Sequence, residues 1–121
     1  MTTTTVPPAL ISAVEGCWDL APQYRIILHR AGDTLRVQQQ SVDRLGKRVL
    51  RTEEVRYKPD DNTLGFSGIG NIHRVVVMLR PVNEGLESAF SAEISPGKWT
   101  SGTWERATRC TATTLDNDQA R

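Results

Sequence analysis

Glu53 and His73 are the side chains in this sequence best suited to moving a proton. Histidine titrates near neutral pH, and a carboxylate beside it can act as a general acid or base. The two residues fall at similar heights on predicted strands with one further strand between them, where Gly68 adds little steric bulk. They are the candidate catalytic residues, although an ordinary hydrogen-bonded histidine explains the same pattern.

The sequence holds no other catalytic or metal-binding pattern. Gly65, Gly68 and Gly70 lie within and after a predicted strand rather than between a strand and a helix, so they do not form a phosphate-binding loop. A Gly-x-Ser-x-Gly elbow and a closely spaced histidine pair are both missing. The two cysteines, Cys17 and Cys110, cannot supply four zinc ligands. We therefore expect no metal and no cofactor.

Whether Cys17 and Cys110 form a disulfide stays open at this stage. Their predicted strands, the first and the last, would adjoin and bring the thiols together. An intracellular setting would keep them reduced.

Eight β-rich runs alternate with turn residues at nearly regular spacing. Such a series is typical of a sandwich or barrel, and a meander of this length usually closes on itself to protect its edge strands. We predict an all-β fold, an eight-stranded antiparallel up-and-down β-barrel, with a two-sheet sandwich as the alternative. The runs are residues 16–20, 24–30, 34–42, 48–58, 63–69, 73–82, 86–94 and 98–108.

Alternate residues of these runs share one inward face, which is apolar at one end of the barrel and polar at the other. A polar mouth over an apolar floor suits an amphipathic small molecule. Rim residues that merely pair with one another would give the same pattern. The apolar ligand-binding candidates are Leu28, Val37, Val55, Phe66, Val75, Phe90 and Trp104, and the polar ones are Tyr24, Gln39, Ser41, Arg51, Glu53 and His73.

The ends of the chain differ from its middle in composition. Residues 1–6 and 110–121 are poor in core residues, so we expect two disordered tails around a single domain at residues 7–109. Pro7 and Pro8 precede a short apolar segment, which predicts a short N-terminal helix that packs on the barrel as a lid.

Charge and hydropathy limit the partners that we expect. A formal net charge of +1 gives no electrostatic reason to expect nucleic acid. The longest apolar runs, such as residues 75–79, are too short to span a membrane as a helix. The first residues lack the features of a secretory signal, so the expected location is cytoplasmic. Outward-facing Leu50, Val76 and Met78 favour a homodimer as one further partner.

Gly16-Cys17-Trp18 opens the first predicted strand, and Trp104-Glu105-Arg106 lies on the last. This arrangement resembles the calycin superfamily, which includes lipocalins, fatty-acid-binding proteins and avidins. The resemblance implies that Trp18 lies on the barrel floor and that Arg106 covers its ring. The turn at residues 21–23 is shorter than the long first loop of lipocalins, and the biotin-binding residues of avidins are not recognised.

Three functions follow from these features. The leading one is a barrel that holds a hydrophobic or amphipathic small molecule in its interior. The second is a small isomerase or cyclase in which the cavity orients the substrate and Glu53 or His73 transfers a proton. The third is a protein-interaction or inhibitor module.

Overall fold

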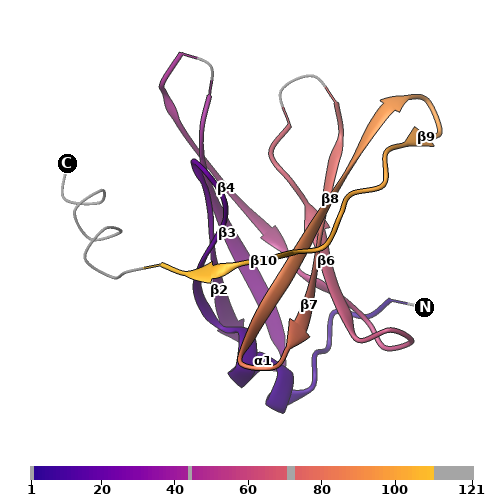
Figure 1. Cartoon of the computed structure of the whole chain (residues 1–121). Helices are drawn as coiled ribbons and strands as arrows, with labels where there is room; N and C mark the ends of the chain where they lie inside the picture. The colour runs from indigo at the N-terminus through magenta and orange to yellow at the C-terminus, as the bar shows by residue number, and fades with distance from the viewer. Residues whose placement is uncertain (1, 44, 71–72, 111–121) are drawn as a thin grey trace.

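The computed structural model describes residues 2–43, 45–70 and 73–110. The described chain folds into antiparallel sheets with one short helix, which confirms the all-β class and the N-terminal helix (Figure 1). Its elements are α1 (Pro8–Val14), β1 (Gly16–Ala21), β2 (Tyr24–Ala31), β3 (Thr34–Val42), β4 (Arg48–Glu54), β5 (Arg56–Lys58), β6 (Thr63–Ser67), β7 (Val75–Val82), β8 (Gly85–Ser95), β9 (Lys98–Trp99), β10 (Glu105–Arg106) and β11 (Thr108–Arg109).

The strands form two sheets rather than one. The first has the order β11-β1-β2-β3-β4, and the second has the order β10-β8-β7-β6-β5, with β9 paired to β8. Tight turns connect consecutive strands, and several need the left-handed backbone that glycine and asparagine tolerate. Gly32 (φ 66°) lies in the β2–β3 turn and Asn62 (φ 57°) in the β5–β6 turn.

At each margin, one continuous segment of the chain runs from one sheet into the other. At Val55 the chain leaves β3, with a last hydrogen bond from the Val55 N–H to the Leu35 carbonyl (3.1 Å), and then pairs with β6 through Arg56 and Gly65. At the other margin, β9 and β10 pair with β8, whereas β11 pairs with β1. The prediction of one closed sheet of eight strands is therefore wrong: the run at 48–58 bends into two strands and that at 98–108 gives three.

The break in the last run coincides with a close approach of two backbone segments. Gly102 lies so close to the Phe90 backbone that a Cβ atom there would collide with it. Between Thr100, whose N–H donates to the Ala92 carbonyl (2.9 Å), and Glu105 the chain lies outside the strands. The regular alternation of faces ends there.

The inward face that sequence alternation predicts is confirmed by burial and register. Phe66 pairs with Val77, which pairs with Phe90, and Leu64 pairs with Leu79. The core side chains are almost fully buried and include Ile26, Leu28, Leu35, Val37, Val55, Leu64, Phe66, Val77, Leu79 and Leu86.

Helix α1 closes the narrow end of the molecule (Figure 1). It buries Leu10, Ile11 and Val14 against the core, and the Trp18 indole N–H donates to the Val14 carbonyl (2.8 Å). The predicted packing of this helix on the sheets is confirmed.

Residues 2–6, the described part of the tail predicted at residues 1–6, are part of the fold rather than disordered. Val6 is fully buried and its N–H donates to the Asp33 carbonyl (2.9 Å), while Thr3 forms a β-bridge with Tyr57. These backbone partners hold a segment whose composition alone gave no sign of burial.

At the other end of the chain, Cys110 is bound to Cys17 by a disulfide, with their Cα atoms 5.5 Å apart, and its N–H donates to the Cys17 carbonyl (3.2 Å). Residue 110 thus belongs to the fold, and the rest of the predicted tail lies outside the described residues. In the part of the chain that the structure describes, no helix is long and apolar enough to cross a membrane.

The arginine over Trp18 is Arg109, not Arg106. Its guanidinium lies 4.0 Å from the centroid of the Trp18 ring and donates to the carbonyl oxygens of Glu15 (2.9 Å) and Ala13 (3.4 Å). Arg106 precedes the change of sheet and instead donates to the carbonyl oxygen of Asn83 (3.0 Å) in the β7–β8 turn. The chain passes from the second sheet to the first between Arg106 and Thr108, so the arginine that reaches Trp18 is not the one that the resemblance implied.

Candidate functional site

Hydrogen bonds link Tyr24, Gln39 and Ser67 across the interior, where the two sheets separate. Gln39 is completely buried; its amide N–H donates to the Ser67 carbonyl (2.7 Å) and its amide oxygen accepts the Tyr24 hydroxyl (2.5 Å). Ser67 is the last residue of β6 and lies beyond the residues of that strand that pair with β5. Its carbonyl therefore faces the boundary between β4 and β6. Gln39 thus joins the two sheets where no backbone ladder does.

Tyr24 is shaped by this buried environment. Its ring packs against Phe90 with centroids 5.6 Å apart, and burial raises the pKa of its phenol well above the usual value, an effect that the positive charge of Arg51 partly offsets. The phenol therefore stays protonated and remains a hydrogen-bond donor to Gln39.

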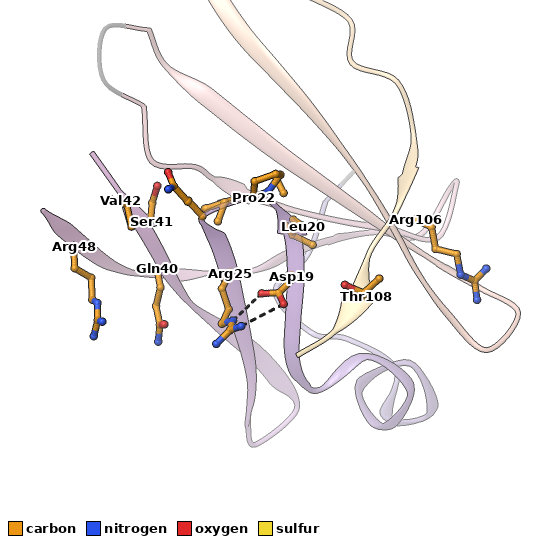
Figure 2. Close-up of a pocket in the computed structure, with 13 residues that line it drawn as sticks. Asp19, Leu20, Pro22, Arg25, Gln40, Ser41, Val42, Arg48, Arg106 and Thr108 are labelled. Atoms are coloured by element: carbon orange, nitrogen blue, oxygen red, sulfur yellow. Dashed lines mark hydrogen bonds and ion pairs between the residues drawn. The ribbon is translucent and has the colours of Figure 1, made fainter. Parts of the chain in front are cut away.

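The largest hollow, about 630 Å³, lies beside the β1–β2 turn and the edges of β3 and β4 (Figure 2). Its volume falls within the usual range of small-molecule sites, roughly 300–1,000 Å³. Its lining combines apolar side chains with hydrogen-bonding and charged ones. The lining residues are Asp19, Leu20, Ala21, Pro22, Gln23, Tyr24, Arg25, Gln40, Ser41, Val42, Arg48, Arg106 and Thr108.

A polar row crosses the outer face of the first sheet at this hollow. Thr108, Asp19, Arg25 and Gln40 occupy neighbouring register positions on four adjacent strands, and Figure 2 shows their side chains on the same side of the sheet. Arg25 donates to Asp19 through Nε (2.7 Å) and Nη2 (3.3 Å), a two-point contact that fixes the guanidinium plane. Only 15% of the Arg25 side chain is exposed.

The structure divides the predicted polar site residues among three hollows. Tyr24 and Ser41 line the largest one. Glu53 lines a second hollow of about 460 Å³, over the outer side of β5, β6 and β7, and Arg51 and His73 line a third of about 280 Å³ at the rim. Gln39 lies behind Tyr24 in the interior.

Glu53 and His73 are not brought together. The Glu53 carboxylate pairs with Arg51 (3.1 Å), and His73 is exposed, with no hydrogen bond or ion pair from its side chain within residues 2–43, 45–70 and 73–110. The two residues line different hollows and share no hydrogen bond or ion pair among the described residues, so the predicted acid-base pair is not formed.

The predicted apolar site residues differ in how deeply they are buried. Leu28, Val37, Val55 and Phe66 are core residues, whereas Val75 and Phe90 are only partly buried against that core.

Trp104 does not line the interior, which corrects its predicted inward position. It is half-buried beside Arg80, whose guanidinium lies 4.2 Å from the ring centroid and pairs with Glu87 (2.7 Å). The irregular chain before β10 breaks the alternation on which the inward prediction depended.

Some residues at or near the hollows were not predicted from the sequence. Asp19 and Arg25 are not among the predicted site residues; their opposite charges on adjacent predicted strands are the signal that could have paired them. Ser88 is also new: it lies on the inner face of β8, and its buried hydroxyl has no hydrogen-bond partner among the described residues. A buried unpaired hydroxyl is uncommon and calls for a polar partner.

Comparison with family models, with curated proteins and with solved structures found no match for this chain. Among the described residues, no group of three or more His, Cys, Asp or Glu side chains is placed to hold a metal ion. The function must therefore be argued from the geometry of the chain itself.

Proposed function

We propose that this chain binds a small amphipathic molecule in the 630 Å³ hollow beside the β1–β2 turn. The observation that carries the proposal is the combination of a ligand-sized volume with a lining that contains both apolar and charged residues. This keeps the small-molecule function expected from the sequence but moves the ligand from the interior to the rim of the first sheet. A calycin-like relationship belongs to the same proposal and rests on the residue pattern alone.

The lining suggests how such a molecule would lie. Leu20, Pro22 and Val42 offer an apolar strip for a hydrocarbon portion. Arg25 and Arg48 would attract an acidic or hydrogen-bonding group of the ligand. Because Asp19 holds Arg25 in one orientation, little side-chain freedom is lost when a ligand binds.

The packing behind the hollow also favours a ligand site there. Tyr24 lines the hollow, and its other contacts, with Phe90 and Gln39, fix it to the interior of both sheets. A site whose side chains are held by packing and hydrogen bonds binds more tightly than a mobile one.

Titration of the ¹⁵N-labelled chain with decanoate and with decanol would test the proposal. We expect saturable shifts at the amides of Ala21, Tyr24 and Ser41, with tighter binding of decanoate because of the arginines. Ala21→Trp would fill the hollow and abolish these shifts. Ala31→Trp is the matched control, since Ala31 ends the adjacent strand at its other end and lines none of the three hollows.

Equal binding by the two tryptophan variants, or shifts spread over the whole surface, would remove the proposal. Both alanines are exposed, so neither substitution disturbs the core. A loss of binding in Ala21→Trp alone would assign the ligand to this hollow.

We also infer that the chain folds in an oxidising compartment rather than in the cytoplasm expected from the sequence. The Cys17–Cys110 bond supports this, because cytosolic thiols are normally kept reduced. Mass spectrometry after thiol alkylation of the natively isolated protein would show no modified cysteine; alkylation of both would contradict the inference.

A further inference from the structure

The 280 Å³ hollow lies at the rim, beside β4, β9 and the described residues 68–70 and 73–74 between β6 and β7. It is separate from the ligand site proposed above and shares no lining residue with it. Its volume is near the lower limit of small-molecule sites, so it fits a compound of about one ring. Its lining residues are Arg51, Ser67, Gly68, Gly70, His73, Arg74, Val75, Val76 and Trp99.

The charged groups of this hollow are all basic. Arg51 and Arg74 line it together with His73, and no carboxylate does. Glu53 pairs with Arg51 (3.1 Å) but faces the neighbouring 460 Å³ hollow, and Glu93 pairs with Arg74 (3.4 Å) from β8. Each of these pairs uses one nitrogen of a guanidinium that carries five N–H donors, so further donors remain for an anion.

Trp99 adds a flat apolar surface to the same hollow. Its ring is 40% exposed, which is unusual for so large an apolar side chain, and the Arg74 guanidinium lies 5.7 Å from its centroid. An exposed indole beside basic groups can stack with a second aromatic ring while those groups neutralise a charge.

The backbone around the hollow is closely fitted. A Cβ atom at Gly70 would collide with the His73 carbonyl oxygen, and the Gly68 N–H donates to the Val75 carbonyl (2.8 Å). These contacts hold the end of β6 against the start of β7, so His73 and Arg74 have defined positions beside the hollow.

From these observations we propose that the rim hollow binds a small aromatic carboxylate, with the carboxylate between Arg51 and Arg74 and the ring against Trp99. The basic lining selects for the anion, the indole selects for the ring, and the volume limits the size. This site is independent of the amphipathic ligand proposed for the larger hollow.

Binding of benzoate, followed by NMR at the indole N–H signals of the ¹⁵N-labelled chain, tests this assignment. The chain has three tryptophans, and the Trp99 signal is identified by its loss in Trp99→Leu. We expect a saturable shift of that signal with benzoate, and at least about fivefold weaker binding of neutral benzamide and of non-aromatic cyclohexanecarboxylate. Trp99→Leu should remove the binding when it is measured by saturation-transfer signals of benzoate itself.

Arginine variants give the second arm of the experiment. Arg74→Gln and Arg51→Gln should each weaken benzoate binding about five- to tenfold. Arg36→Gln is the matched control, because Arg36 is an exposed strand arginine that lines none of the three hollows. The Arg74 side chain is 79% exposed, so its replacement leaves the fold intact.

Four results would each overturn the proposal. They are equal affinity for benzoate and benzamide, a shift at Trp104 in place of Trp99, an Arg36→Gln effect as large as that of Arg74→Gln, and the absence of any saturable shift with benzoate. None of these results bears on decanoate binding at the larger hollow, so the two proposals fail separately.

Discussion

Replacement of Gln39 by leucine tests whether this buried amide holds the two sheets together. In Gln39→Leu the Tyr24 hydroxyl loses its acceptor in a buried position, and the Ser67 carbonyl loses its donor. Ser67 is exposed, so water can replace that second bond, and most of the loss comes from Tyr24. A buried polar group without a partner costs about 1–3 kcal/mol, and we expect the free energy of unfolding to fall by about 2 kcal/mol.

Tyr24→Phe completes a double-mutant cycle with Gln39→Leu. Alone it leaves the Gln39 amide oxygen unpaired, and we expect a loss of about 1–2 kcal/mol. In the double variant both polar partners are gone, so the combined loss should be smaller than the sum by about 1–2 kcal/mol. Urea unfolding followed by far-ultraviolet circular dichroism gives all four free energies.

Tyr57→Phe is the control for this cycle, because its hydroxyl also donates to a side-chain amide, that of Asn62 (2.8 Å), but in an exposed position. It should change stability by less than about 0.5 kcal/mol. Additive effects of Gln39→Leu and Tyr24→Phe, or a Gln39→Leu variant as stable as the parent chain, would refute the idea that Gln39 substitutes for the missing backbone ladder.

Other changes follow from the same structure. Arg109→Gln should lower the free energy of unfolding by about 1–2 kcal/mol and change Trp18 fluorescence, whereas Arg106→Gln should leave that fluorescence unchanged; the reverse order would restore the sequence-based assignment. Reducing the Cys17–Cys110 bond, which closes a loop with a sequence separation of 93, should cost about 3–5 kcal/mol in urea unfolding, and no change would mean that the bond does not limit the unfolded chain. Because burial raises the Tyr24 pKa above its ordinary value of 10.0, the unfolded chain loses that proton first as the pH rises, so stability should fall above about pH 10 by up to about 1.4 kcal/mol per pH unit. Tyr24→Phe should flatten this alkaline loss. Gly102→Ala should destabilise the chain by about 1–3 kcal/mol in the same unfolding assay through collision with the Phe90 backbone; an unchanged midpoint would show that the 100–104 segment is free to move.

The strand positions could be predicted because each depends on local signals. Turn residues such as Gly32 and Asn62 separate the runs, and alternation identified the inward side of β3, β6, β7 and β8. These features are encoded over a few neighbouring residues and hold wherever the strand is regular.

The predictions are wrong where the chain does not form a regular strand. The bend at Val55 and the close approach of Gly102 to Phe90 depend on contacts between segments that are far apart in the sequence. The alternation of apolar and polar residues within a strand does not reveal such contacts. The irregular segment around Gly102 and the change of sheet after Arg106 interrupt the last predicted strand, so Trp104 and Arg106 do not have the surroundings that were predicted.

The candidate site was predicted only in part for a related reason. Tyr24, Gln39 and Ser41 were selected from parity, and the structure places Tyr24 and Ser41 at the largest hollow with Gln39 behind them. The Asp19–Arg25 pair was missed because all predicted site residues lay on the inner face, whereas this pair lies in the polar row on the other face of the first sheet.

The bond between Cys17 and Cys110 makes the backbone between them a covalent ring. A protease that cuts the exposed turn at residues 59–62 would therefore open the ring without releasing either piece, since β1 and the end of the chain stay tied beside each other. Such a nicked molecule would gain only the mass of one water until a reductant separated the two fragments, and it would retain both sheets through the pairing of β1 with β11 and of β10 with β8.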